Sequence, residues 1–122
     1  MAKTVLICDD NKLLRSFVRA SLARDGYTCA EAPDAGESVR LAKSMRPDLV
    51  ILDVMMPGGS GLDVLAELRR DPDLASTPVV LITAAVRTFA GVRAQDFGAE
   101  RCLTKPFRHA QLRSAVEAVL AR

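Results

Sequence analysis

The apolar pattern of this chain changes period repeatedly, and this alternation limits the fold more than any other feature. Two runs, Val5–Cys8 and Leu49–Leu52, are continuously apolar, as strands buried on both faces usually are. Other short runs are rich in β-branched residues or alternate between apolar and polar residues, and they end at glycine, proline or charged positions. The predicted strands are Thr4–Cys8, Tyr27–Glu31, Leu49–Leu52, Val79–Thr83 and Arg101–Thr104.

Helical patterns separate these strands. Apolar side chains recur at helical spacing within residues 14–22, 38–45, 62–68 and 112–120, and a thinner pattern over 86–97 predicts a fifth helix, which we expect to be mobile. Gly26 can end the first helix in the left-handed conformation, and Pro78 introduces the fourth strand. Alternating strands and helices predict βαβ units with right-handed crossovers. We therefore expect an α/β fold with a five-stranded parallel sheet and helices on both faces.

Length and composition are those of one domain spanning residues 1–122. The 122 residues are 49% hydrophobic, which is enough to form a core that needs no stabilising metal ion or disulfide bond. The formal charge is +2 with no Lys/Arg block, so direct nucleic-acid binding is not expected. No apolar run approaches the roughly 18 residues of a membrane span, and the first apolar run is too short for a signal peptide. We expect a cytoplasmic protein without membrane contact, and its last helix ends without a linker, which favours a complete stand-alone domain.

Cysteine and arginine positions add two weaker expectations. Cys8, Cys29 and Cys102 lack metal-like spacing and lie in apolar or strand-like stretches, so we interpret them as reduced core residues. The C-terminal third has a basic character, for which a solvated face is the simpler interpretation and a docking surface for an acidic partner the alternative. Its arginines are Arg87, Arg93, Arg101, Arg108 and Arg113.

Polar residues follow four of the predicted strands. In open parallel sheets, ligands bind beyond the carboxyl ends of the strands. Here Asp9 and Asp10 follow the first strand, Asp53 follows the third, Thr83 ends the fourth, and Lys105 follows the fifth. We therefore expect these side chains to converge at one edge of the sheet.

Such a set of side chains suits phosphoryl chemistry. Crowded carboxylates repel one another unless a cation neutralises them, and hard oxygen ligands with several waters suit Mg²⁺ best. A metal-bound carboxylate can attack phosphorus to form an aspartyl phosphate. The metal and a lysine would stabilise the charge of the transferring group, and a threonine hydroxyl could donate a hydrogen bond to it.

Several ordered stretches give the chain a family resemblance. It resembles the receiver domain of two-component response regulators (CheY-like) over essentially its whole length. The resemblance implies a flavodoxin-like strand order 2-1-3-4-5. The stretches that carry it are residues 5–10 (VLICDD), 47–57 (PDLVILDVMMP), 60–61 (SG), 78–84 (PVVLITA), 98–99 (GA) and 105–107 (KPF).

The resemblance implies a metal site. Asp10 corresponds to a direct ligand of Mg²⁺, and Asp9 to a neighbour that acts through water. Asp53 shares the site, and the backbone carbonyl of Met55 corresponds to a further protein ligand.

The resemblance also implies roles in phosphorylation. Asp53 corresponds to the phosphoryl acceptor, with a histidine kinase or a histidine phosphotransfer protein as donor. Thr83 corresponds to the hydroxyl that moves toward the phosphoryl group, and Lys105 to the ammonium that pairs with it, commonly beside a cis Lys–Pro bond. Many family members carry Tyr or Phe three positions before the lysine. Cys102 stands there in this chain, which places the usual coupling between threonine and aromatic ring in doubt.

We therefore predict a phosphorylation-activated switch, not an enzyme, that changes its binding to a downstream protein target and exists as a monomer or weak dimer. One alternative is a pseudo-receiver scaffold that binds partners regardless of phosphorylation. A haloacid-dehalogenase-type phosphatase is a second, although Met55 occupies the place where such enzymes have a second acid. A third is a flavodoxin-like redox carrier, although Asp9 and Asp10 would repel a flavin phosphate.

Overall fold

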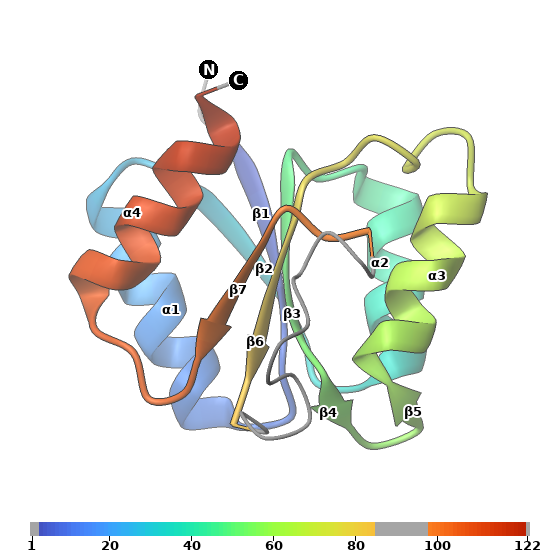
Figure 1. The fold of residues 1–122 in the computed structure, drawn as a ribbon, viewed down its shortest axis with the longest axis horizontal. Helices are drawn as coiled ribbons and strands as arrows, with labels where there is room; N and C mark the ends of the chain where they lie inside the picture. The colour runs from blue at the N-terminus through green and yellow to red at the C-terminus, as the bar shows by residue number, and fades with distance from the viewer. Residues whose placement is uncertain (1–2, 85–97, 122) are drawn as a thin grey trace.

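The fold is built on a parallel sheet of five strands. The computed structural model describes residues 3–84 and 98–121. Within them the main sheet has the order β2-β1-β3-β6-β7 with every pair parallel (Figure 1). Because β4 and β5 form a separate hairpin, β6 and β7 are the fourth and fifth strands of the main sheet, and the expected order 2-1-3-4-5 is confirmed. The strands are β1 (Thr4–Cys8), β2 (Thr28–Ala32), β3 (Leu49–Asp53), β6 (Val79–Thr83) and β7 (Arg101–Thr104).

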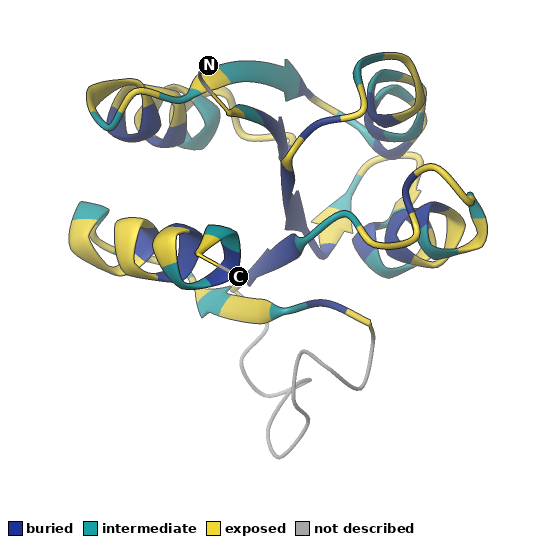
Figure 2. Cartoon of the chain, turned by 90° about the horizontal axis from the view of Figure 1, so that it is seen from above, coloured by how far each residue is buried: buried dark blue, intermediate teal, exposed yellow. Residues whose placement is uncertain are grey.

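Helices cover both faces of this sheet. The described helices are α1 (Lys12–Arg24), α2 (Ala35–Met45), α3 (Gly61–Arg70) and α4 (His109–Leu120). Helices α1 and α4 lie on one face, and α2 and α3 lie on the other (Figures 1 and 2). The helix expected over 86–97 lies outside the described residues. No helix in the described ranges is long and apolar enough to cross a membrane.

Two apolar cores result from this layering. Successive residues of a strand point to opposite faces of the sheet. Because helices cover both faces, both sets of side chains are buried in the central strands β1, β3 and β6. Ile51 belongs to the core beneath α1 and α4, whereas its neighbour Leu52 belongs to the core beneath α2 and α3. This is why the two central runs of the sequence are continuously apolar.

Local signals place the helix ends. The side chains of Asn11, Asp34 and Ser60 accept hydrogen bonds from backbone N–H groups in the first turns of α1, α2 and α3. Gly26 follows α1 with a φ of 90°, in the left-handed region that the sequence predicted.

A short antiparallel hairpin connects β3 to α3. Strands β4 (Met55–Met56) and β5 (Gly59–Ser60) form it, where the sequence predicted a tight turn with Ser60 as a helix cap. Gly61, which follows, packs directly on the end of β3: a Cβ atom there would lie 2.0 Å from the carbonyl oxygen of Asp53. The hairpin and Gly61 therefore hold the backbone of Asp53 in place.

Some sequence expectations need correction. Cys8 is buried as expected, but Cys29 is half-buried and Cys102 is exposed, so the prediction that all three cysteines lie in the core is wrong for Cys102. Strand β7 lies at the edge of the sheet, with β6 as its neighbour on one side, and its residues are less buried than those of the central strand β6. Strand β2 begins and ends one residue later than predicted, and β3 includes Asp53.

Candidate functional site

The acids that follow β1 and β3 meet at the carboxyl edge of the sheet. Strands β1 and β3 are hydrogen-bonded neighbours, so their ends lie side by side. Asp9 is fully buried and Asp53 is 2% exposed, whereas Asp10 is exposed. One carboxylate oxygen from each of the three lies within 4.8 Å of the others. The convergence that the sequence predicted for these acids is present.

Lys105 reaches this cluster from the end of β7. Its Nζ atom lies 2.9 Å from Oδ2 of Asp9 and 3.3 Å from Oδ2 of Asp53. Its backbone N–H donates a 2.8 Å hydrogen bond to the carbonyl oxygen of Thr83, so the end of β6 positions the start of the segment that carries the ammonium. The Lys105–Pro106 peptide bond is cis, as the resemblance implied.

Thr83 lies at the same edge of the sheet. It is the last residue of β6 and is 1% exposed. Strand β6 pairs with β3, and the carbonyl of Ile82 accepts a 3.0 Å hydrogen bond from the N–H of Val54, directly after Asp53. The hydroxyl-bearing residue thus ends a strand adjacent to the one that ends in the central acid.

Backbone N–H groups orient the two buried carboxylates. Oδ1 of Asp9 accepts a 2.8 Å hydrogen bond from the N–H of Asn11. Oδ1 of Asp53 accepts a 3.2 Å hydrogen bond from the N–H of Met55, so the backbone of Met55 lies beside the Asp53 carboxylate. In both residues Oδ2 is the oxygen that faces Lys105.

The electrostatics favour an added positive charge. Burial raises the pKa of the Asp53 carboxyl, and the nearby charge of Asp9 raises it further, against the lowering effects of the Met55 N–H and of Lys105. Burial would lower the pKa of the Lys105 ammonium, but Asp9 and Asp53 outweigh it and raise this pKa. Lys105 therefore stays charged, and among the described residues its single ammonium faces a cluster of carboxylates that it cannot fully neutralise.

The residues present fit a hard divalent cation. Carboxylate oxygens and backbone carbonyls are the ligands that Mg²⁺ prefers, and a site with few carboxylates leaves room for its waters. The cluster of Asp9, Asp10 and Asp53 supplies such oxygens close together, and Asp10 is open to solvent.

One residue beside the cluster had no signal in the sequence. Arg15, in the second turn of α1, donates a 2.8 Å hydrogen bond from Nη1 to the backbone carbonyl of Asp9. Its Nε donates to Glu31 of β2. This arrangement depends on which residue of β2 lies beside the start of α1, and neither spacing nor residue type reveals that pairing.

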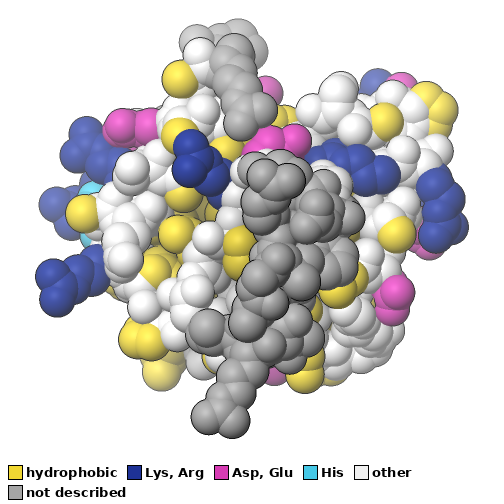
Figure 3. All heavy atoms as spheres, viewed as in Figure 1, with side chains coloured by type: hydrophobic (Ala, Val, Ile, Leu, Met, Phe, Trp, Pro, Cys, Tyr) yellow, Lys and Arg dark blue, Asp and Glu magenta, His cyan; other side chains and the backbone are white. Residues whose placement is uncertain are grey.

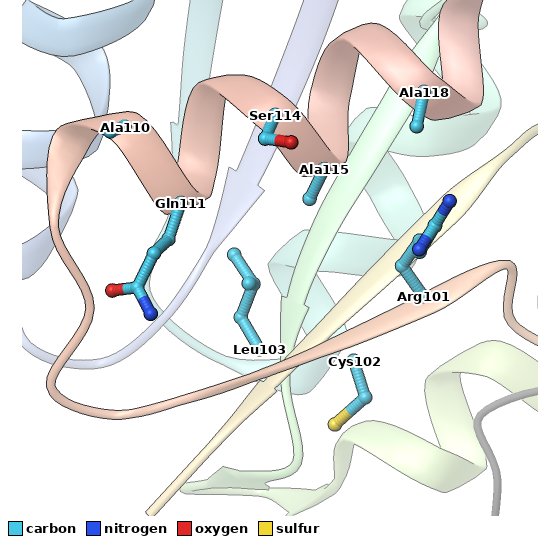
Figure 4. Close-up of a pocket in the computed structure, with 8 residues that line it drawn as sticks. All are labelled: Arg101, Cys102, Leu103, Ala110, Gln111, Ser114, Ala115 and Ala118. Carbon is cyan, nitrogen blue, oxygen red and sulfur yellow. The ribbon is translucent and has the colours of Figure 1, made fainter.

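A shallow groove lies on the surface between β7 and α4. Figure 4 shows the side chain of Leu103 pointing toward α4 and that of Cys102 pointing away from it. Basic side chains lie at the edge of the molecule near α4 (Figure 3), and Arg101, Arg108 and Arg113 are exposed. The groove is lined by Arg101, Cys102, Leu103, Ala110, Gln111, Ser114, Ala115 and Ala118.

Comparison with known proteins places this chain and its fold in a family. Residues 5–117 match the response regulator receiver domain. The phosphate regulon transcriptional regulatory protein PhoB of Pseudomonas aeruginosa is 33% identical over 122 residues, which are 100% of this chain and 53% of PhoB. The chain belongs to the response regulator receiver domain family of two-component systems.

Solved structures of receiver domains and response regulators have the same fold as this chain. The chemotaxis response regulator CheY4 of Vibrio cholerae superimposes with a TM-score of 0.89 at 28% identity, covering 98% of this chain and 100% of that one. The signal receiver domain of a signal transduction histidine kinase from Syntrophus aciditrophicus has a TM-score of 0.89 at 32% identity, covering 98% of this chain and 91% of that one. The chain spans about half the length of the curated relatives it matches.

Proposed function

We propose that this domain is a phosphorylation-dependent switch that accepts a phosphoryl group on Asp53 from a histidine kinase or a histidine phosphotransfer protein. The observation that carries the proposal is the placement of a buried carboxylate 3.3 Å from the Lys105 ammonium, within a cluster of acids that can hold a cation. Burial and the charge of Asp9 disfavour the ionised carboxylate, and binding of a cation relieves that repulsion.

In the proposed reaction a carboxylate oxygen of Asp53 is the nucleophile. It forms a bond to phosphorus while the bond from phosphorus to the donor breaks, and the donor leaves with the electron pair. Lys105 stabilises negative charge on the transferring group, and Thr83 donates a hydrogen bond to it.

Mg²⁺ supplies charge neutralisation for the phosphoryl oxygens when it is bound. Asp10 and Asp53 would hold it directly, together with the carbonyl of Met55, and Asp9 would act through water. The clustering of the three acids and the exposure of Asp10 support this assignment, and the hydrogen bond from the Met55 N–H places the backbone of Met55 beside the Asp53 carboxylate.

Phosphorylation would change binding to a protein partner. A phosphoryl group adds nearly two negative charges and strong acceptor oxygens, which Thr83 and Lys105 can engage. Both residues belong to the β6–β7 side of the sheet, and Lys105 is joined to α4 by a short loop. The new contacts would bias a pre-existing equilibrium of this side of the molecule, including the groove between β7 and α4.

Phosphoryl transfer from radiolabelled acetyl phosphate tests the proposal. With Mg²⁺ present, the wild-type protein should incorporate label that is lost in Asp53→Asn and retained in Asp63→Asn, which alters an exposed acid in the first turn of α3. Chelation of the metal should abolish labelling of the wild type. Equal labelling of Asp53→Asn and the wild type would refute the assignment of Asp53.

The same protein preparations separate the alternatives. A pseudo-receiver scaffold would bind its partner equally with and without a phosphoryl analogue. A phosphatase would turn over a generic phosphomonoester. The acid that such an enzyme usually has two positions after its nucleophile is replaced here by Met55, and this favours the switch.

A further inference from the structure

The peptide group that links the metal-site acids is held from outside the acidic cluster. The preceding peptide group, between Cys8 and Asp9, is held by β2: the N–H of Asp9 donates a 3.1 Å hydrogen bond to the carbonyl of Ala32, the last residue of that strand. The carbonyl of Asp9 accepts a 2.8 Å hydrogen bond from Nη1 of Arg15. Because this carbonyl belongs to the peptide plane between Asp9 and Asp10, Arg15 determines how that plane is turned and so where the Asp10 side chain begins.

Arg15 is itself held in place. Its Nε donates a 2.9 Å hydrogen bond to Oε1 of Glu31, and its side chain is 14% exposed. The other oxygen of Glu31 accepts a 2.7 Å hydrogen bond from Nη1 of Arg19, one turn further along α1. One carboxylate from β2 thus binds two guanidinium groups of α1, and such charge-assisted contacts are stronger and more directional than neutral ones.

We infer that Arg15 is a positioning residue for the candidate metal site: held by Glu31, its guanidinium fixes the Asp9–Asp10 peptide so that the acidic side chains converge on one cation. Arg15 donates to the Asp9 carbonyl and to Glu31, so its positioning effect on the metal passes through the backbone. This inference rests on the metal site of the proposed function.

The charge of Arg15 provides a discriminating test. A guanidinium near the cluster repels a divalent cation, so loss of its charge alone would raise metal affinity. Loss of its positioning contact would lower metal affinity, since residues that orient metal ligands typically contribute about 10–100-fold to affinity. The two effects have opposite signs.

Arg19 is the matched control. The substitution Arg19→Gln removes a guanidinium charge that binds the same Glu31 carboxylate. Within the described residues, the hydrogen bond of Arg19 goes to Glu31 and not to the Asp9 backbone. Arg15→Gln and Arg19→Gln therefore differ in the contact with Asp9. Arg15→Lys keeps the charge but loses the fork that joins Glu31 to the Asp9 carbonyl.

The experiment titrates each folded protein with Mn²⁺ and follows the electron paramagnetic resonance signal of the free ion, with circular dichroism to confirm folding. We expect Arg15→Gln to bind Mn²⁺ about tenfold more weakly than the wild type, and Arg15→Lys to be weakened in the same direction. Arg19→Gln should bind as tightly as the wild type or slightly more tightly.

The outcomes separate this inference from the proposed function. If wild-type protein binds Mn²⁺ and Arg15→Gln binds as well as Arg19→Gln, the positioning role is refuted and the metal site stands. If wild-type protein binds no Mn²⁺, both the metal site and the role of Arg15 are refuted. A general loss of stability would lower the melting temperature of both variants but would not weaken metal binding in Arg15→Gln alone.

Discussion

Asp53 combines near-complete burial with a neighbouring negative charge. Burial first, and the charge of Asp9 second, raise the pKa of its carboxyl above the usual 3.8. Between that value and the higher pKa of the native state, the native protein binds more protons than the unfolded chain. Stability therefore falls as pH rises through this window and stays lower above it.

Replacement of Asp53 by asparagine should relieve this repulsion. We expect metal-free Asp53→Asn to melt a few degrees higher than the wild type at neutral pH, because the ionised carboxylate is absent. The variant should also lack the wild type's loss of stability above the usual carboxyl pKa. Thermal melts in chelator between acid and neutral pH measure both effects, and a lower melting temperature of the variant at neutral pH would contradict the argument.

Gly61 controls the position of the Asp53 backbone by its lack of a side chain. In Gly61→Ala the new Cβ would lie 2.0 Å from the carbonyl oxygen of Asp53, and backbone atoms cannot move aside as a flexible side chain can. We expect a loss of about 1–3 kcal/mol or more in the free energy of unfolding, measured by urea denaturation.

Gly36→Ala is the control for this substitution. Its Cβ would meet the Oδ1 atom of Asp34, the residue that caps α2, at 3.6 Å, which is an ordinary van der Waals contact. Alanine is favoured over glycine in helices by up to about 1 kcal/mol, so this variant should be neutral or slightly more stable. Equal destabilisation of both variants would show that the close approach of Gly61 is unimportant.

At the level of elements, α4 is attached to the sheet by a narrow apolar face. Its buried residues are Leu112, Ala115, Val116 and Val119. They complete the core on the side of α1. The helix carries the surface through which we propose the domain signals, so its attachment determines how far that surface can change.

Truncation of Leu112, which is fully buried, should loosen this attachment. We expect Leu112→Ala to lower the free energy of unfolding by about 2–5 kcal/mol, measured by chemical denaturation. Ser114→Ala changes an exposed residue of the same helix and should stay within about 0.5 kcal/mol of the wild type. Alanine has the highest helix propensity, so neither substitution should weaken the helix itself, and a similar loss in both variants would contradict the packing argument.

The element scale is also where sequence prediction worked best. The five strands of the main sheet and the four described helices all lie where the periodicity placed them, with boundary shifts of one residue at β2 and β3. The buried central strands are continuously apolar and the helices are amphipathic, so the order of apolar and polar residues predicts which side chains are buried. The hairpin β4–β5 was expected as a turn because its two-residue strands are too short for a periodic signal.

For the whole molecule, both cores share the same central strands. Val5 and Ile7 pack on one face of β1, and Leu6 and Cys8 pack on the other. Loss of either core would expose one face of the strands that also form the other core. This arrangement favours a single cooperative unfolding transition over separate melting of two layers.

We therefore expect two probes of unfolding to give one transition. Far-ultraviolet circular dichroism reports all helices, and the fluorescence of Tyr27, the chain's single tyrosine, reports the core beneath α1 and α4. Leu65→Ala alters the opposite core and should shift both midpoints together. A shift seen by circular dichroism but not by Tyr27 fluorescence would show that the layers unfold separately.

The sequence by itself determined the strands, the helices and the set of polar residues at the strand ends, because local periodicity and turn chemistry encode burial and chain reversal. It also placed Asp9, Asp10, Asp53, Thr83 and Lys105 at one edge of the sheet. The tertiary structure decided the features that depend on neighbours far apart in the chain. The Nζ atom of Lys105 bridges two carboxylates. Arg15 donates hydrogen bonds both to the Asp9 carbonyl and to Glu31. Cys102 is exposed on an edge strand. Periodicity specifies which face of an element is buried, but only the packing of the elements specifies which side chains meet.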